Sequence, residues 1–201
     1  ESKNGYIEIC NSTDIVTWEF GHLLENYSPE DYDEKFQFRR LEDLPIIPSE
    51  WKLKLKDSAK AQFNTIKKLA SKADIIVNAG DPDREGQLLV DELLDYIDNN
   101  KPVKRILLNA LDEKSVKQAL NNLRDNHDFV GLKNSARARS YADWLVGMNL
   151  SRAFTVPAKA AGYIGGLRIG RVKTPTMALV VRREEEIKNF KPVQYYQVQV
   201  D

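Results

Sequence analysis

The stretch that decides the fold reads Asp74-Ile-Ile-Val-Asn-Ala-Gly-Asp-Pro-Asp-Arg-Glu-Gly-Gln87. It opens with a short apolar run typical of a buried strand, and an amphipathic helix with leucines as its apolar positions follows it. Between the two stand three acids at alternate positions, Asp81, Asp83 and Glu85. Open α/β sheets bind ligands beyond the carboxyl ends of their strands. The order of strand, acidic turn and helix therefore predicts a ligand site at these acids.

The chemistry of the acidic turn favours a hard divalent cation. Carboxylates this close repel one another, and Mg²⁺ accepts one or two of them while it keeps waters or substrate phosphates as its other ligands. We therefore expect Asp81, Asp83 and Glu85 to bind Mg²⁺. The alternative is that the acids only cap the helix, because Asp is a preferred N-cap residue and Asp83 stands at a suitable position.

Composition places the chain among ordinary globular proteins, with 201 residues, 42% hydrophobic and 30% charged. The longest uninterrupted apolar run, Met177–Val181, is far too short to span a membrane. The single cysteine, Cys10, excludes an internal disulfide and a cysteine-based zinc site, and it favours a cytoplasmic location. No Gly-x-x-x-x-Gly-Lys-Ser/Thr segment is present, which argues against a nucleotide-binding P-loop.

The net charge is zero, but the charges are unevenly distributed. Residues 1–60 hold thirteen acids and eight bases, a balance of −5, whereas residues 133–173 hold eight bases and one acid, a balance of +7. Bases that hold a phosphate backbone, joined to acids that hold a metal ion, suit a protein that handles phosphodiesters. The alternative interpretation is a surface of uneven charge without a nucleic-acid partner.

Hydrophobic periodicity predicts alternating strands and helices over the first 130 residues. The predicted segments are strands at 6–10 and 15–20 paired as a hairpin, a surface loop at 27–50, a helix at 58–71, a strand at 75–78, a helix ending near 97, a strand at 105–109, a helix capped by Asp112 and a turn at 125–128. Short connections between such elements indicate an α/β fold in which helices cover a parallel sheet.

After about residue 130 the pattern becomes mainly α-helical. We expect one helix from 135 to about 154 and a second from about Thr174, where Pro175 suits a first-turn position. Residues 195–200 alternate like a strand. Trp144 and Tyr141 stand at helical spacing, which is more typical of core residues than of platforms for nucleic-acid bases.

A second motif, Gly165-Gly-Leu-Arg-Ile-Gly-Arg-Val-Lys-Thr-Pro-Thr176, joins a glycine turn to a helix start. Free backbone N–H groups and the helix dipole attract phosphate there, and Arg171, Lys173 and Thr174 add side-chain donors. Glycine also lets a sugar-phosphate strand approach the backbone closely. The alternative is a basic, well-capped surface helix.

Four segments, in order along nearly the whole chain, resemble type IA DNA topoisomerases, and most closely their topoisomerase III branch. The acidic turn resembles the motif of the Toprim domain in the form used by this family, and Gly21-His-Leu23 resembles its Gly-His-Leu motif. The segment from Arg139 to Arg152 resembles one of its helices. Gly170-Arg-Val-Lys-Thr-Pro175 resembles its Gly-Arg-Val-Gln-Thr-Pro helix, with Lys173 in place of the usual Gln.

The resemblance implies an isomerase that cuts and reseals one DNA strand through a phosphotyrosine intermediate, depends on Mg²⁺, and relaxes or unlinks DNA. Asp81, Asp83 and Glu85 would be its catalytic metal ligands. The partner would be DNA, chiefly single-stranded, bound by His22, Arg139, Arg152, Arg168, Arg171, Lys173 and Thr174. The implied domains are a Toprim domain at 1–130, a helical DNA-groove domain at 131–191 and the first strand of a β arch at 192–201.

Parts of the family pattern are missing from the chain. None of its eight tyrosines is followed by proline, so the family's Tyr-Pro-Arg-Thr-like nucleophile motif has no counterpart, and neither has its opening strand with a Glu and a Lys. We therefore expect a fragment that does not cleave DNA by itself. Two other interpretations are another Toprim phosphotransferase or nuclease, such as a primase, and a non-catalytic module that binds single-stranded DNA. Outside the resemblance, His22 is best interpreted as a structural histidine.

Overall fold

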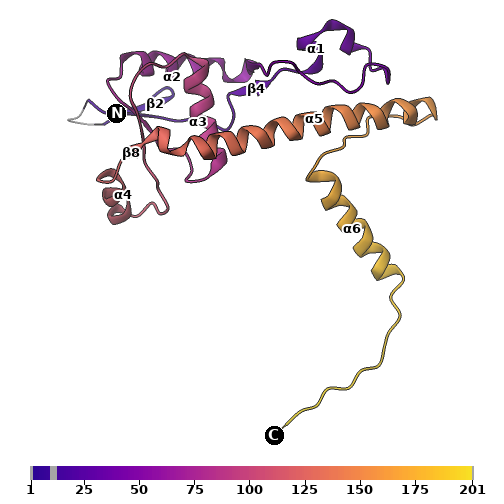
Figure 1. Cartoon of the computed structure of the whole chain (residues 1–201). Helices are drawn as coiled ribbons and strands as arrows, with labels where there is room; N and C mark the ends of the chain where they lie inside the picture. Colours follow the sequence, from indigo (N-terminus) through magenta and orange to yellow (C-terminus); the bar gives the residue numbers. More distant parts are fainter. Residues whose placement is uncertain (1, 10–12, 201) are drawn as a thin grey trace. The chain divides into compact units, whose positions relative to one another are not determined.

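The computed structural model of the chain describes residues 2–9 and 13–200 (Figure 1). The predicted strand end at Cys10 and the turn at 11–12 lie outside the described residues. The chain forms two compact units, each made of two stretches. Unit 1 comprises Glu1–Phe38 and Ile47–Ala142, and unit 2 comprises Arg39–Ile46 and Asp143–Asp201.

The described chain opens with four strands, continues with a mixture of strands and helices, and closes with helices. Up to residue 72 the elements are β1 (Ser2–Lys3), β2 (Tyr6–Glu8), β3 (Ile15–Thr17), β4 (Leu24–Asn26), α1 (Pro29–Tyr32), the 3-10 helix η1 (Glu34–Gln37), β5 (Leu53–Leu55), the 3-10 helix η2 (Asp57–Ala59) and α2 (Lys60–Lys72). After residue 72 the elements are β6 (Ile76–Asn78), α3 (Arg84–Tyr96), β7 (Val103–Arg105), α4 (Glu113–Leu120), β8 (Arg124–Asp125), the 3-10 helix η3 (Asn126–Phe129), α5 (Val130–Ala160) and α6 (Lys173–Lys188).

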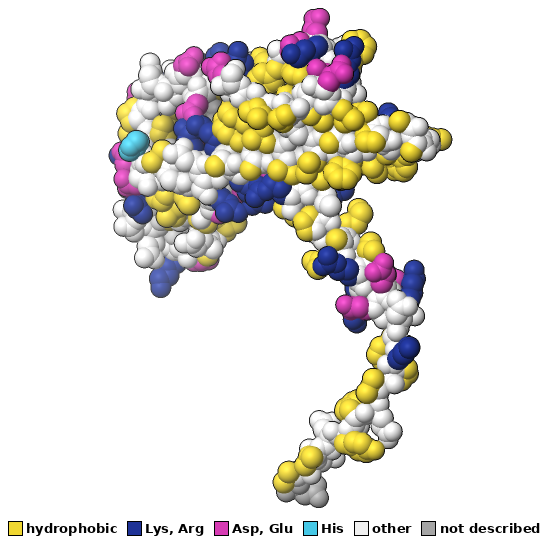
Figure 2. Space-filling model, turned by 45° about the vertical axis from the view of Figure 1, so that its right-hand side comes forward, with side chains coloured by type: hydrophobic (Ala, Val, Ile, Leu, Met, Phe, Trp, Pro, Cys, Tyr) yellow, Lys and Arg dark blue, Asp and Glu magenta, His cyan; other side chains and the backbone are white. Residues whose placement is uncertain are grey.

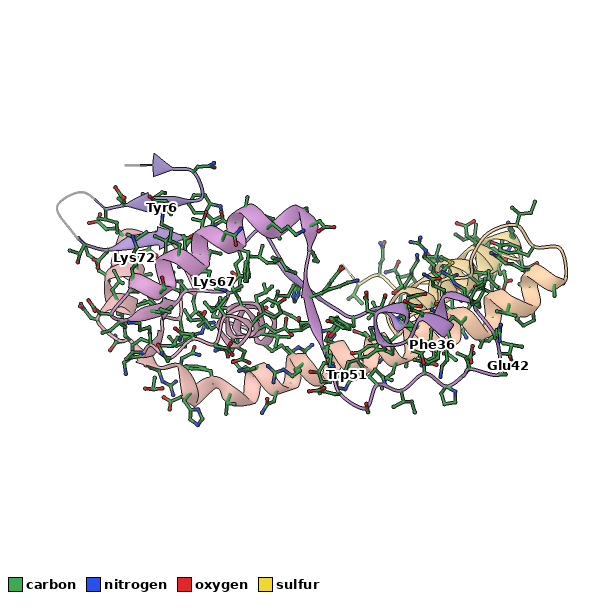
Figure 3. All side chains as sticks on the ribbon, turned by 90° about the horizontal axis from the view of Figure 1, so that it is seen from above. Tyr6, Phe36, Glu42, Trp51, Lys67 and Lys72 are labelled. Carbon is green, nitrogen blue, oxygen red and sulfur yellow. The ribbon has the colours of Figure 1, made fainter. Side chains whose placement is uncertain are left out.

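An antiparallel sheet of β1, β2 and β3 opens unit 1 and confirms the predicted hairpin. In its register Ile7 lies opposite Val16. Figure 3 shows Tyr6 of this sheet beside α2, which carries Lys67 and Lys72. The Gln62 side-chain amide of α2 donates hydrogen bonds to two backbone carbonyls of the hairpin region, and these bonds hold the helix against the sheet.

The loop predicted at 27–50 is only partly a loop, because α1 and η1 form within it. Ser28 starts α1 through a capping box in which its backbone N–H donates to the Asp31 carboxylate at 2.7 Å. The strands β4 and β5 pair antiparallel on either side of this region, with Leu24 opposite Leu55. Short polar stretches with good caps thus form helical turns that hydrophobic periodicity does not reveal.

The central sheet of unit 1 pairs β6 with β7 in parallel and β7 with β8 antiparallel. This arrangement confirms the α/β class, although the sheets are small and of mixed orientation. The strand expected at 105–109 lies earlier, at β7, and the turn expected at 125–128 contains β8 and η3 instead. Leu23, Ala59, Phe63, Ile66 and Leu93 form the hydrophobic core.

The helix expected from 135 to about 154 extends further at both ends as α5, and Pro157 lies in its last turn. Its first thirteen residues belong to unit 1 and the remainder to unit 2, since the units divide between Ala142 and Asp143. The helix expected near Thr174 is confirmed as α6. None of the helices in the described residues is long and apolar enough to cross a membrane.

The strand predicted at 195–200 does not form, since residues 190–200 have no regular secondary structure. A strand takes its hydrogen bonds from a neighbouring strand, and no described segment pairs with this one. Its side chains are consequently exposed, Tyr195 by 80% and Val198 by 88%. Figure 2 shows hydrophobic side chains on α6 and along the segment that follows it, in the lower part of the view.

Candidate functional site

The acidic turn leaves β6 at Asn78 and ends where Asp83 caps α3. The Asp83 Oδ1 atom accepts a hydrogen bond from the Gly86 backbone N–H at 2.8 Å. Inside the turn, the Asp83 backbone N–H donates to the carbonyl of Asp81, also at 2.8 Å. The Asn78 side-chain oxygen accepts from the Gly80 N–H at 3.0 Å. The short polar side chains of the segment therefore hold the turn by local bonds.

Two glycines allow the turn to fold back onto the first turn of α3. A Cβ atom on Gly86 would lie 2.5 Å from both the backbone nitrogen and the carbonyl oxygen of Asp81. A Cβ atom on Gly80 would collide with the Gly86 carbonyl oxygen. Only glycine fits such an approach of one backbone to another, so these two positions fix the path of the chain at Asp81.

A buried arginine, Arg105, binds the turn from beneath. The β6–β7 register places Arg105 beside Asn78, and its side chain is 0% exposed. One guanidinium nitrogen donates to the Gly80 carbonyl at 2.7 Å and to the Asn78 carbonyl at 3.1 Å. The other donates to the Asp81 carbonyl at 2.6 Å. A planar guanidinium presents several donors in fixed directions, so one side chain satisfies carbonyls that a turn leaves free.

Burial lowers the pKa of Arg105 from its usual value, while the charges of Asp91, Asp83 and Asp81 raise it. From the sequence we expected Arg105 only as the start of a strand, and this role was missed. The sequence did hold a signal for this role, namely a charged residue in a strand that was expected inside the parallel sheet. A charged side chain is rarely buried unless it is paired, so a partner for Arg105 could have been expected. Arg105 thus supplies positive charge directly beneath two of the predicted metal ligands.

A buried polar network continues from the turn into α3 and η3. The Asn126 side chain accepts hydrogen bonds from Asn78 at 3.1 Å and from Gln87 at 2.9 Å. It donates to Asp91 at 2.7 Å, and Gln87 donates to the other Asp91 oxygen at 2.9 Å. A connected network of this kind rigidifies its surroundings. It ties the acidic turn to elements that lie far apart in the sequence.

The three predicted metal ligands differ in their surroundings. Asp81 and Asp83 are exposed at the surface of unit 1, and Asp83 also serves as the helix cap. Glu85 is half-buried and lies 3.8 Å from the Arg139 guanidinium of α5 and 3.9 Å from that of Arg84. Among the described residues no three carboxylate, imidazole or thiol side chains are grouped closely enough to hold a metal ion. The structure thus does not gather the three acids into one ligand set.

His22 lies close to an acid of α3, Glu92, in unit 1. Its Nδ1 atom is 3.9 Å from the Glu92 carboxylate, and its backbone carbonyl accepts a hydrogen bond from Lys56 at 2.7 Å. Burial lowers the pKa of His22, and the charge of Lys56 lowers it further. Burial also raises the pKa of Glu92, and it raises the pKa of Glu19, which faces the charge of Glu92, to about 8.

The basic motif belongs to unit 2. Its side chains Arg168, Lys173 and Thr174 are exposed, and the Arg171 guanidinium donates to the Asp143 carboxylate at 3.0 Å. The Thr174 hydroxyl accepts from the Gly170 N–H at 3.0 Å, so it stabilises the turn that leads into α6.

Arg152, by contrast, is only 5% exposed. Little of the residue is accessible to a DNA strand in this structure, and the DNA contact of Arg152 stays a prediction. The position on α5 decides its burial, and the charge of the residue gave no indication of it.

Comparison with known proteins places these features in a family. The sequence model of the Toprim domain family matches residues 3–111. The sequence model of the DNA topoisomerase family matches residues 128–201. The chain belongs to the Toprim family, and its second part is similar to the DNA topoisomerase family. The first match contains the acidic turn and Arg105, and the second contains α5, the basic motif and α6. The resemblance inferred from the four sequence motifs is thereby confirmed.

Curated relatives agree with this assignment. The chain is 50% identical to the DNA topoisomerase 3 of Vibrio cholerae over 191 residues, which is 93% of the chain and 30% of that relative. It is 47% identical over 199 residues to the protein of the same name from Pasteurella multocida, and 48% identical over 199 residues to that from Salmonella typhimurium. In both cases the match covers 97% of the chain and 30% of the relative, so the chain spans about a third of the length of these topoisomerases.

Proposed function

We propose that the chain is the part of a type IA DNA topoisomerase that holds the metal ion and one strand of DNA. The whole enzyme would cut and reseal a single strand through a phosphotyrosine intermediate and so relax or unlink DNA. The observation that carries the proposal is the acidic turn, which Arg105, two glycines and a buried network hold in one conformation. A turn held this firmly while it presents exposed carboxylates suits a ligand site.

The donor set of the turn fits Mg²⁺. Asp81 and Asp83 offer hard carboxylate oxygens at the surface, and Mg²⁺ needs only one or two of them when waters complete its shell. The Asp83 Oδ1 atom serves as the cap, which leaves its Oδ2 atom for the ion. Glu85 would join through water or after it leaves Arg139. When bound, the ion would neutralise charge on a DNA phosphate.

DNA binding is proposed for cationic and donor side chains of both units. They are His22 and Arg139 in unit 1, and Arg168, Arg171, Lys173 and Thr174 in unit 2. These side chains would bind mainly phosphates, so affinity would depend on charge more than on base sequence. We keep single-stranded DNA as the expected substrate, and a cytoplasmic location stays a prediction that accompanies it.

The division into functional domains is likewise proposed. A boundary near residue 130 falls close to the gap between the two family matches and at the start of α5. Residues 192–201 would form the first strand of a β arch once a partner strand is present. The attacking tyrosine would come from a part of the enzyme other than this chain, and the chain alone is expected not to cleave DNA.

A single pair of titrations tests the proposal on the 201-residue chain. Calorimetry with MgCl₂ should show binding that disappears when Asp81→Asn and Asp83→Asn are combined, because both carboxylates are then neutral. Fluorescence anisotropy with an oligo-dT strand should show an affinity that falls steeply with salt, by about 0.7 in the log–log slope for each phosphate that is bound. Equal Mg²⁺ affinity of the variant and the unmodified chain would refute the proposed metal site. Equal DNA affinity at low and high salt would refute the proposed DNA binding.

One observation favours a second function. Asp83 does cap α3, so the acids of a non-catalytic DNA-binding module could serve only the fold. In that case the titration with DNA would succeed and the titration with MgCl₂ would show no binding by the unmodified chain. A Toprim nuclease or primase, the other alternative, would bind Mg²⁺ but gives no role to the basic motif before α6.

A further inference from the structure

Two hydroxyl groups on α5 bind the backbone of the basic motif. The Thr155 Oγ1 atom accepts a hydrogen bond from the Leu167 N–H at 2.9 Å and donates to the Leu167 carbonyl at 3.2 Å. One turn earlier, the Ser151 Oγ atom accepts from the Ile169 N–H at 2.9 Å and donates to the Ile169 carbonyl at 3.3 Å. Each hydroxyl thus pairs with both backbone groups of one residue, as a neighbouring strand would.

The spacing of the two hydroxyls matches the backbone that they bind. Four residues of an α-helix rise about 6 Å, and two residues of an extended chain span about 6.6 Å. Residues four apart on α5 therefore meet every second residue of the segment 167–169. Figure 1 shows the chain after α5 returning alongside the second half of that helix. The helix therefore presents two hydroxyls, one turn apart, to a segment that runs antiparallel to it.

Two more residues extend this row at the same spacing. A Cβ atom on Gly147 would lie 3.6 Å from the Ile169 carbonyl oxygen, which is ordinary van der Waals distance, so this position of α5 also borders the segment. Four residues before it, the Asp143 carboxylate accepts the bond from Arg171. Asp143, Gly147, Ser151 and Thr155 thus form one stripe, which we name the α5 track.

The track determines which groups of the segment face outward. In an extended chain the backbone groups of alternate residues point to opposite sides. Leu167 and Ile169 turn theirs toward α5, while the Gly170 N–H, on the other side, is bound by Thr174. The Arg168 side chain, between the two bound residues, is exposed. A slip of one residue along the track would exchange the positions of Arg168 and its apolar neighbours.

We propose that Ser151 and Thr155 are positioning residues for DNA binding, because they set the register in which the basic motif presents Arg168 and Arg171. The inference rests on the proposed function of that motif. Neither hydroxyl touches DNA in this proposal, and each acts through the backbone that it binds. The two residues are partly buried and buried, respectively, which suits a role in the scaffold rather than at the surface.

The test compares two double variants of the 201-residue chain. Ser151→Ala with Thr155→Val removes both hydroxyls at nearly constant volume. Ser151→Thr with Thr155→Ser keeps a hydroxyl at both positions and serves as the rescue. Thr176→Val is the matched control, since its hydroxyl bonds to the Val172 carbonyl at the start of α6 and not to the segment 167–169. Amide hydrogen exchange at Leu167 and Ile169 reports the register directly, and oligo-dT binding over a range of salt concentrations reports its consequence.

Loss of both hydroxyls should speed exchange at Leu167 and Ile169 at least tenfold. It should weaken oligo-dT binding about tenfold and reduce the log–log salt slope by about 0.7 for each phosphate that is no longer bound. The rescue variant and Thr176→Val should stay within twofold of the unmodified chain in both measurements. Unchanged exchange or unchanged DNA binding in the variant without hydroxyls would overturn the proposal.

A failure of the proposed function would look different. If the unmodified chain binds oligo-dT no better than Arg168→Ala does, the basic motif is not a DNA site and the proposed function is wrong there. In that case the positioning proposal is overturned with it, although the exchange data would still show the track. If Arg168→Ala weakens binding but the variant without hydroxyls does not, only the positioning proposal is overturned.

Discussion

The guanidinium of Arg105 donates a hydrogen bond of 2.6 Å to the backbone carbonyl of Asp81, so a buried cation supports the residue that opens the acidic turn. The bond joins the end of one parallel strand to the loop that follows its neighbour. It gives the acidic turn two properties that a metal site needs, a fixed backbone and reduced repulsion between carboxylates. Four predictions test how this turn and its surroundings are built.

Arg105→Lys should lower the free energy of unfolding by about 3 kcal/mol. Lysine keeps the charge but cannot reach the carbonyls of Asn78, Gly80 and Asp81 together, and buried carbonyls without donors are costly. Urea denaturation measures the loss. Arg124→Lys is the control, because Arg124 is exposed and pairs with Asp128 at 3.3 Å, and it should cost less than about 0.5 kcal/mol. Equal losses in the two variants would contradict a special role for Arg105.

Asp83 should prove to have two separable roles. Asn caps a helix about as well as Asp, so Asp83→Asn should change the free energy of unfolding by less than about 0.5 kcal/mol, whereas Asp83→Ala should lower it by about 1 kcal/mol. Both variants should bind Mg²⁺ at least tenfold more weakly in calorimetry, because both lose the carboxylate charge. If Asp83→Asn binds Mg²⁺ as tightly as the unmodified chain, Asp83 serves only as the N-cap of α3.

Gly86→Ala should displace the acidic turn. Its methyl group would meet the backbone of Asp81 at 2.5 Å, and relief of such overpacking costs about 1–3 kcal/mol. Denaturation should show this loss together with weaker Mg²⁺ binding. Gly131→Ala, in α5 with no atom within 4 Å of the added methyl group, should instead stabilise the chain by about 0.5–1 kcal/mol. If Gly86→Ala changes neither the free energy of unfolding nor Mg²⁺ binding, the backbone of the turn can shift to accept the methyl group at little cost.

Glu19 should make the chain less stable as the pH rises from about 4.5 to 8. In the unfolded chain its carboxyl ionises near its ordinary value of 4.5, whereas burial and the charge of Glu92 raise the pKa in the folded chain to about 8. Between these values the folded state retains a proton that the unfolded state has lost, so the free energy of unfolding falls as the pH increases.

Glu19→Gln should remove this dependence. The variant should be more stable than the unmodified chain by about 1–2 kcal/mol at pH 8, after allowance for solvent screening of a partly exposed group, and nearly equal to it at pH 4.5. Urea denaturation at pH 4.5, 6, 7 and 8 measures the difference, and comparison of the two proteins cancels the opposite contribution of His22, whose pKa is lowered. Parallel stability curves would refute the raised pKa.

Much of unit 1 could be predicted from local patterns. The apolar run before the acids forms β6, the leucine-rich pattern after them forms α3, and Asp112 caps α4 as expected, with its side chain accepting from the Ser115 N–H. Such features depend on a few neighbouring residues, because periodicity and capping are local properties. The placement of Asp81 and Asp83 at a strand end follows from the same local order.

Other features could not be predicted, because they depend on residues far apart in the chain. The burial of Arg152, which we predicted as a DNA contact, could not be foreseen from the sequence. Residues 195–200 alternate like a strand but stay irregular, since alternation cannot supply the partner that a strand requires. The α5 track was hidden as well, because a serine and a threonine inside a helix have no obvious meaning until the returning segment is in place.

The amino-acid sequence by itself determined the family, the order of the elements and the acids at the carboxyl end of β6, since these follow from short motifs and local periodicity. Only the tertiary structure decided that Arg105 lies beneath those acids, that Glu85 faces Arg139, and that Ser151 and Thr155 bind the basic motif. The physical reason is that hydrogen bonds and ion pairs between distant segments depend on where the whole backbone runs, which no local pattern encodes.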